Sequence, residues 1–173
     1  MEQKSKTGRE NPSRKIKIEK VVLSIGGIGE ELEKGVKLLQ LLTEKKPAKM
    51  KTTKRIPSLG IRPKLEIGTV STVRKNPEEF LKKMLATIDN TLKKSQISQN
   101  NFSFGLQEYI EIPGVEYKRE IGIMGLDVTV VFKRMGKRVK LKKIKRGKIP
   151  RKQHISKKEI IKFMEDNFQT QFL

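Results

Sequence analysis

The sequence contains no cysteine and a single histidine, His154. Without cysteine the chain has no disulfide, no thiolate zinc site, no iron–sulfur cluster and no cysteine nucleophile. One histidine also excludes a metal site built from several histidines. We therefore expect neither a metal nor a cofactor.

Long apolar runs are missing as well. No stretch approaches the roughly 18 apolar residues that a membrane-spanning helix requires. The N-terminal residues MEQKSKTGREN lack the apolar stretch of a signal peptide. These absences predict a cytoplasmic protein that does not insert into a membrane.

Acidic residues are scarce in two long segments. The 173 residues include 40 Lys and Arg against 19 Asp and Glu, a formal net charge of +21. Residues 45–64 carry eight basic residues and residues 133–158 carry fourteen, and neither segment contains an acid, while the rest is close to neutral. Two such cationic blocks predict a polyanionic partner, because their mutual repulsion destabilises the free fold. Nucleic acid is the first interpretation and an anionic membrane surface a distant second.

Aromatic residues are few, seven Phe and two Tyr with no Trp. No segment fits the aromatic pattern of a base-stacking RNA-recognition sheet. Few aromatics with many Lys and Arg favour a structured RNA, which is recognised through shape, phosphates and 2′-hydroxyl groups.

Catalytic groups are also absent from the sequence patterns. The glycine-rich segment GGIGEELEKG lacks the spacing of a phosphate-binding loop, so it is interpreted as a strand-to-helix turn. Glu108 and Glu111 are expected on opposite faces of one strand, where they cannot act as a carboxylate pair. We expect no catalytic residue and no enzymatic activity.

Hydrophobic patterning predicts strands at 16–26, with a bulge near Glu19–Lys20, and at 66–74, 102–112 and 125–133. Residues 137–144 are expected to return as a hairpin partner of the last strand, and 49–63 as mainly loop. Helices are expected at 30–43, from Asn76 to about Leu92, and from Ser156, where Glu159 completes a capping box. This order predicts one α+β domain over residues 1–173. It has a largely antiparallel sheet with helices on one face, basic loops, a basic C-terminal segment and a flexible extension at 1–13.

Several segments resemble a known family. They are NPSRKIKIEKVVLSIGGIG, LLTEKKPAKMKTTKRIPSLGIRPKLEIGTVSTVR, NFSFGLQEYIEIPGVEY and REIGIMGLDVTVVFKR. In order, and over about residues 11–168, they are similar to the universal large-subunit ribosomal protein L-five family. The tail KIPRKQHISKKEIIKFME favours its archaeal and eukaryotic branch, whose eukaryotic member is called L-eleven.

The resemblance implies a function and a set of partners. Family members bind 5S rRNA, help attach it to the large-subunit rRNA and form part of the central protuberance, beside a neighbouring 5S-associated protein. They contact a small-subunit head protein across an intersubunit bridge, and one loop reaches the P-site tRNA.

The resemblance also assigns residues. Ser24 stands where the family often has an asparagine, Lys45 replaces a glutamine that contacts RNA, and Thr72 keeps the family's threonine, followed by Arg74. The tRNA-approaching loop corresponds to about 50–60, with Lys51, Lys54 and Arg55. Further basic residues expected to contact RNA are Arg14, Lys15, Arg62, Lys64, Lys142, Lys143, Arg146 and Arg151.

Two other interpretations of the sequence remain. One is a free-standing architectural protein for structured RNA or DNA. The other, weaker, is a nucleic-acid-processing enzyme whose acids have not been paired.

Overall fold

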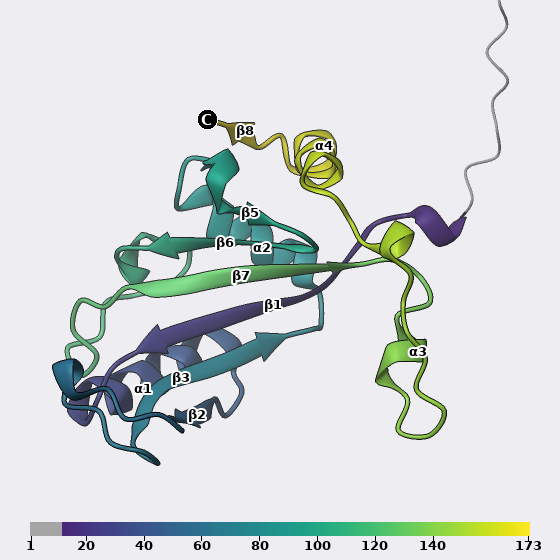
Figure 1. The fold of residues 1–173 in the computed structure, drawn as a ribbon. Helices are drawn as coiled ribbons and strands as arrows, with labels where there is room; N and C mark the ends of the chain where they lie inside the picture. Colours follow the sequence, from purple (N-terminus) through teal and green to yellow (C-terminus); the bar gives the residue numbers. More distant parts are fainter. Residues whose placement is uncertain (1–11) are drawn as a thin grey trace, which may run out of the picture.

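A six-stranded antiparallel sheet forms the centre of the computed structural model, which describes residues 12–173 (Figure 1). Its strand order is β2-β3-β1-β7-β6-β5. The strands are β1 (Lys17–Gly26), β2 (Ala48–Lys51), β3 (Glu66–Val73), β5 (Ile97–Ser98), β6 (Asn101–Leu106) and β7 (Leu126–Lys133). A short parallel pair, β4 (Thr91–Leu92) with β8 (Gln171–Phe172), joins the C-terminus to the segment after the second helix.

Three helices of ten or more residues accompany the sheet: α1 (Glu30–Thr43), α2 (Pro77–Ala86) and α4 (Lys157–Phe168). A one-turn helix, α3 (Arg138–Leu141), and five 3₁₀ turns complete the described elements. The capping box predicted for the last helix is present: Ser156 Oγ accepts from the backbone N–H of Glu159, whose carboxylate accepts from that of Ser156. The α+β class and the largely antiparallel sheet are confirmed.

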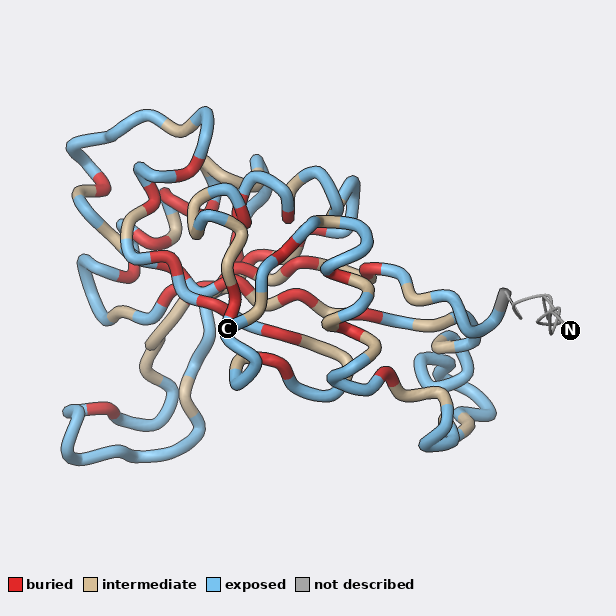
Figure 2. The backbone as a smooth tube through the Cα atoms, turned by 90° about the horizontal axis from the view of Figure 1, so that it is seen from above, coloured by how far each residue is buried: buried red, intermediate tan, exposed pale blue. Residues whose placement is uncertain are grey.

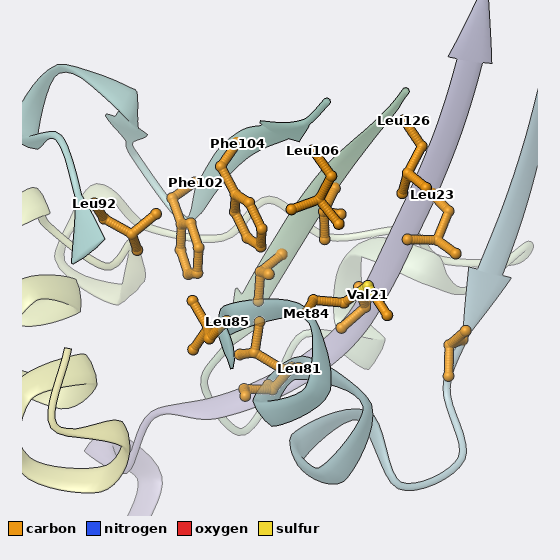
Figure 3. Close-up of a cluster of buried hydrophobic side chains, with 14 of the residues drawn as sticks. Val21, Leu23, Leu81, Met84, Leu85, Leu92, Phe102, Phe104, Leu106 and Leu126 are labelled. Atoms are coloured by element: carbon orange, nitrogen blue, oxygen red, sulfur yellow. The ribbon is translucent and has the colours of Figure 1, made fainter. Parts of the chain in front are cut away.

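Two-residue alternation divides the sheet into a covered and an uncovered face. In β1, Val21, Leu23 and Ile25 are buried, whereas Val22 and Ser24, which alternate with them, are only half-buried. The inward residues meet α2, whose Leu81, Met84 and Leu85 point at them and at Phe102, Phe104 and Leu106 of β6 (Figure 3).

The first helix approaches β1 and β3 on that same face. Gly35 permits the approach, because a Cβ there would lie 3.2 Å from Ile25 Cγ2 and 3.3 Å from Thr69 Cγ2. The helices α1 and α2 thus cover one face of the sheet, as expected.

The predicted bulge in β1 is confirmed. Ile18 pairs with Phe132 and Lys20 with Val131, so Glu19 between them has no partner in β7. The extra residue lets Ile18 and Val21 both face the core although they are three positions apart.

The hairpin predicted at 137–144 is wrong. That segment contains α3 and no strand, because β1 and β6 already occupy both edges of β7. The apolar residues of this segment are exposed: Val139 is 43%, Leu141 63% and Ile144 80% accessible. The alternation therefore reflects no buried face.

The strand predicted at 102–112 ends at Leu106. Tyr109–Glu111 form a 3₁₀ turn, in which Tyr109 is buried and its hydroxyl accepts from the backbone N–H of Lys118 at 3.0 Å. Glu108 and Glu111 therefore do not share a strand. The inward residues change from a spacing of two to a spacing of three at this point, which is the period of a 3₁₀ turn.

Two other boundaries differ from the prediction. The helix α2 ends at Ala86, because Asp89 and Asn90 adopt positive φ, and Leu92 lies in β4 while remaining buried. Residues 49–51, expected as loop, belong to the edge strand β2, which pairs with β3. Of the predicted 1–13 extension, residues 1–11 lie outside the described part of the chain.

Opposite faces of β1 should differ sharply in their contribution to stability. Val21→Ala, in the core, should lower the free energy of unfolding by about 2 kcal/mol through lost burial and a residual cavity. Val22→Ala removes the same atoms from the uncovered face and should cost less than half as much. Urea unfolding of both variants measures this, and equal losses would contradict the assignment of the faces.

Candidate nucleic-acid interface

The face of the sheet that carries no helix is the candidate interface, and we call it the open face. Figure 1 views the sheet from this side, with α1 and α2 behind it. None of its central residues is fully buried, and most are small and uncharged. These central residues are Val22, Ser24, Val70, Thr72, Ser103, Gly105, Asp127 and Thr129.

The strand register places these residues in two rows. Ser24 pairs with Val70 on one side and with Asp127 on the other, and Asp127 pairs with Gly105. In the next row Thr72, Val22, Thr129 and Ser103 lie across the four strands in that order. None of the Ser24, Thr72, Ser103 and Thr129 hydroxyls bonds to another residue within 12–173. The rows therefore present unpaired donors and acceptors on a flat surface.

The structure brings Ser24 and Thr72 together, as diagonal neighbours on adjacent strands. Arg74 is exposed directly after β3, and Lys45 is exposed in the turn between α1 and β2. Because Ala48 pairs with Val70, this turn approaches the half of β3 that contains Thr72.

Two other predicted contacts, Arg14 and Lys15, are exposed just before β1. They lie at the end of the sheet where Lys17 pairs with Lys133, so cations gather there. The predicted rRNA-binding residues thus divide into a neutral centre and a basic margin.

The loop between β2 and β3 is an exposed projection (Figure 2). Its base is closed by backbone bonds from Lys64 N–H to Thr52 O at 2.7 Å and from Thr52 N–H to Leu65 O at 2.9 Å. Ile56 and Ile61 form a bridge further out, and Ile61 is buried. The exposed cations on this loop and its strand are Lys51, Lys54, Arg55, Arg62 and Lys64.

Ion pairs hold only the base of this loop. Lys51 lies 3.6 Å from Glu66, whereas Lys54 and Arg55 have no acidic partner within the described chain. Lys49 donates to Glu33, and this hydrogen bond raises the pKa of Lys49.

The second basic segment forms an arm, residues 134–153, that projects away from the sheet (Figures 1 and 2). Arg134 anchors its base, with Nη2 2.5 Å from Glu159 and Nη1 donating to Lys152 O at 3.2 Å. Gln153 donates to Met135 O at 2.8 Å, and Lys137 pairs with Glu19 in the bulge of β1. The predicted contacts Lys142, Lys143, Arg146 and Arg151 are exposed on this arm.

Glu159 connects the arm to α4. Burial is the largest influence on its pKa and raises it, but hydrogen bonds from Ser156 and the charge of Arg134 outweigh burial, so the pKa lies below its usual value. The ionised carboxylate therefore stabilises the base of the arm.

No metal centre or membrane helix was found among residues 12–173. No group of three or more His, Cys, Asp or Glu side chains there could hold a metal ion. In the same range no helix is long and apolar enough to cross a membrane.

Comparison with known proteins identifies the family. The family model for the C-terminal part of the ribosomal L-five proteins matches residues 66–163. The large ribosomal subunit protein uL5 of Nanoarchaeum equitans is 41% identical over 168 residues, covering 95% of this chain and 99% of the relative. The chain belongs to this ribosomal protein family.

Other relatives agree over similar lengths. The uL5 protein of Sulfolobus acidocaldarius is 40% identical over 169 residues, covering 95% of each chain. That of Archaeoglobus fulgidus is 38% identical over 168 residues, covering 95% of this chain and 94% of the relative. As a member of the family, the protein is a structural constituent of the large ribosomal subunit rather than an enzyme.

The sequence patterns did not identify the three other polar side chains at the centre of the open face, Ser103, Asp127 and Thr129. The alternation in β6 and β7 contained the signal, since each lies between two buried residues. The sequence patterns also missed Arg134 as the anchor of the arm, because the pairing with Glu159 joins residues 25 positions apart.

The pH dependence of stability in a Glu159→Gln variant tests whether the ionised carboxylate stabilises the base of the arm. Glutamine keeps an oxygen acceptor for the cap but removes the charge. A carboxyl whose pKa falls on folding stabilises the protein above its unfolded pKa, here about 4.5, and loses that effect as the pH falls through the folded pKa. Wild type should therefore exceed the variant in unfolding free energy at neutral pH, and the difference should shrink as the pH falls below about 4.5.

Urea unfolding over a pH series measures this difference. Glu165→Gln, on the same helix and exposed, is the matched control and should show no such pH dependence. A constant difference between wild type and Glu159→Gln would contradict the stabilising role of the ionised carboxylate.

Proposed function

We propose that the open face binds 5S rRNA and that the protein thereby helps attach this RNA in the central protuberance of the large subunit. The observation that carries the proposal is the face itself: unpaired hydroxyls at its centre and exposed cations at its margin. Membership of the ribosomal family supports RNA as the partner.

The centre and the margin suit different parts of an RNA. The Ser24 and Thr72 hydroxyls can each donate and accept, so they suit 2′-hydroxyl groups and base edges. Arg14, Lys15, Lys45 and Arg74 suit phosphates, which fix the position of the RNA. This division corresponds to shape and backbone recognition of a structured RNA.

The loop at about 50–60 is proposed to contact a different partner, the P-site tRNA. Its cations Lys54 and Arg55 are exposed and have no acidic partner within residues 12–173. Lys51, at its base, shares the same exposed edge. Arg62 and Lys64 follow the loop, are also exposed, and are proposed as additional RNA contacts.

The arm is assigned to large-subunit rRNA through Lys142, Lys143, Arg146 and Arg151. Contacts with a small-subunit head protein across an intersubunit bridge and with a neighbouring 5S-associated protein rest on the family resemblance alone.

Binding of purified protein to 5S rRNA and to an unrelated structured RNA of equal length tests the proposal. We expect the 5S complex to survive moderate salt, and the unrelated complex to dissociate. Equal affinity for both RNAs would favour the general architectural RNA- or DNA-binding protein instead.

Thr72→Val should weaken 5S rRNA binding. Valine keeps the β-branched shape but removes the hydroxyl, so the loss should be about 0.5–1.5 kcal/mol in binding free energy. Titration of labelled 5S rRNA measures it, with Thr53→Val in the β2–β3 loop as the control. An unchanged dissociation constant with an unchanged melting temperature would remove Thr72 from the interface.

Neutralising the loop should spare 5S rRNA. With Lys51, Lys54 and Arg55 changed to Gln, the salt dependence of 5S binding should stay constant, while ribosomes hold P-site tRNA less firmly. Each phosphate contact contributes about 0.7–0.9 to the slope of log K against log salt.

The same change at Arg14, Lys15 and Arg74 is the matched comparison, and it should lower the 5S slope by about two to three units. A similar drop in the loop variant would return the loop to the 5S-binding surface.

A further inference from the structure

A hollow of about 320 Å³ lies on the open face where β1, β7 and β6 run side by side. Its lining is almost entirely polar: Ser24, Gln96, Ser103, Gly105, Asp127 and Thr129, with Phe104 beneath. It is a concave site within the surface proposed to bind RNA.

Asp127 is the acid within this hollow, and no other residue uses its carboxylate. Asp127 is exposed, and its carboxylate has neither an ion pair nor a hydrogen bond within residues 12–173. Its Oδ1 lies 3.3 Å from the position that a Cβ would take at Gly105, its cross-strand partner. The carboxylate therefore extends over β6, in space that a side chain at position 105 would restrict.

The local charge around this carboxylate is unusual for a protein of net charge +21. Its direct cross-strand partners are Ser24 and Gly105, which are neutral. Along β1, the nearest cation on the open face is Lys20, which pairs with Val131, four residues from Asp127 and therefore about 13 Å along the strand at 3.3 Å per residue. Within residues 12–173, no ion pair neutralises Asp127.

An unneutralised carboxylate repels phosphate and accepts hydrogen bonds without donating any. A nucleic acid lying on this hollow must therefore turn its N–H and O–H donors toward Asp127 and its phosphates toward the basic margin. Suitable donors are the amino groups of cytosine, adenine or guanine, the guanine N1–H and the ribose 2′-hydroxyl.

We propose that the Asp127 hollow is a nucleotide-reading site, in which the carboxylate accepts from a base or ribose donor of the bound RNA. This inference rests on the proposed function of the open face and adds a specificity-determining residue to it. Phosphates position the RNA at the margin, and Asp127 selects which groups face the centre.

The rest of the lining complements such a donor. Gln96 accepts from the backbone N–H of Lys93 through Oε1 at 3.1 Å, so its amide N–H groups have no partner within the described chain. The Ser24, Ser103 and Thr129 hydroxyls can donate or accept. The hollow thus offers a fixed acceptor beside a donor, the pattern that the edge of a nucleobase matches.

Whether Asp127→Asn weakens or tightens RNA binding distinguishes the two possible roles of the carboxylate. If Asp127 accepts from a donor, Asp127→Asn should weaken 5S rRNA binding about tenfold, since it removes a charge-assisted hydrogen bond. If the carboxylate merely lies near phosphates, the same change should tighten binding. Asp89→Asn, on the helical side of the sheet, removes an equal charge and should leave the affinity unchanged or slightly increased.

The measurement is titration of wild type and both variants with an archaeal 5S rRNA transcript, together with their melting temperatures. Weaker binding by Asp127→Asn at an unchanged melting temperature supports the inference, and a second variant, Gly105→Val, should also weaken binding by crowding the carboxylate. Equal or tighter binding by Asp127→Asn, while wild type still prefers 5S rRNA, overturns the inference and leaves the proposed function standing. If wild type shows no preference for 5S rRNA, the proposed function fails, and this site fails with it.

Discussion

The pairing of β1 with β3 on one side and β7 on the other is the constraint on which the rest of the structure depends. With both edges of β1 occupied, each of its residues must face either the helices or the surroundings of the sheet. The helices α1 and α2 cover only one face, so the second must remain compatible with water. Small hydroxyl residues satisfy this requirement without adding charge, and they leave polar groups available to a partner.

Acidic residues from other parts of the chain form ion pairs with the base of each of the two basic segments. Lys49 and Lys51 pair with Glu33 and Glu66, while Arg134 and Lys137 pair with Glu159 and Glu19. Each pair lies at the base of its segment, and most are partly exposed, a class that stabilises proteins by at most about 1 kcal/mol. The cations further out on the loop and the arm form no ion pair within residues 12–173. A polyanionic partner therefore supplies the screening that the chain itself does not.

Much of this architecture could be predicted from local patterns. Alternation located β1, β3 and β7, and Ser156 with Glu159 fixed the start of α4, because these signals come from adjacent residues. The hairpin strand predicted at 137–144 was wrong, because alternation does not reveal whether a neighbouring strand has a free edge for pairing. Of the interface, Ser24 and Thr72 were identified through family resemblance, whereas Asp127 emerged only once the register had placed it between Ser24 and Gly105.

The bulge at Glu19 has a mechanical consequence. The residue that is extra to the β1–β7 ladder is also the one whose carboxylate holds Lys137 of the arm. Glu19 therefore links the central strand to the arm, in addition to the anchor of Arg134 on Glu159 and the direct continuation of β7 into the arm. A nucleic acid that contacted both surfaces would have to match the spacing that these links set.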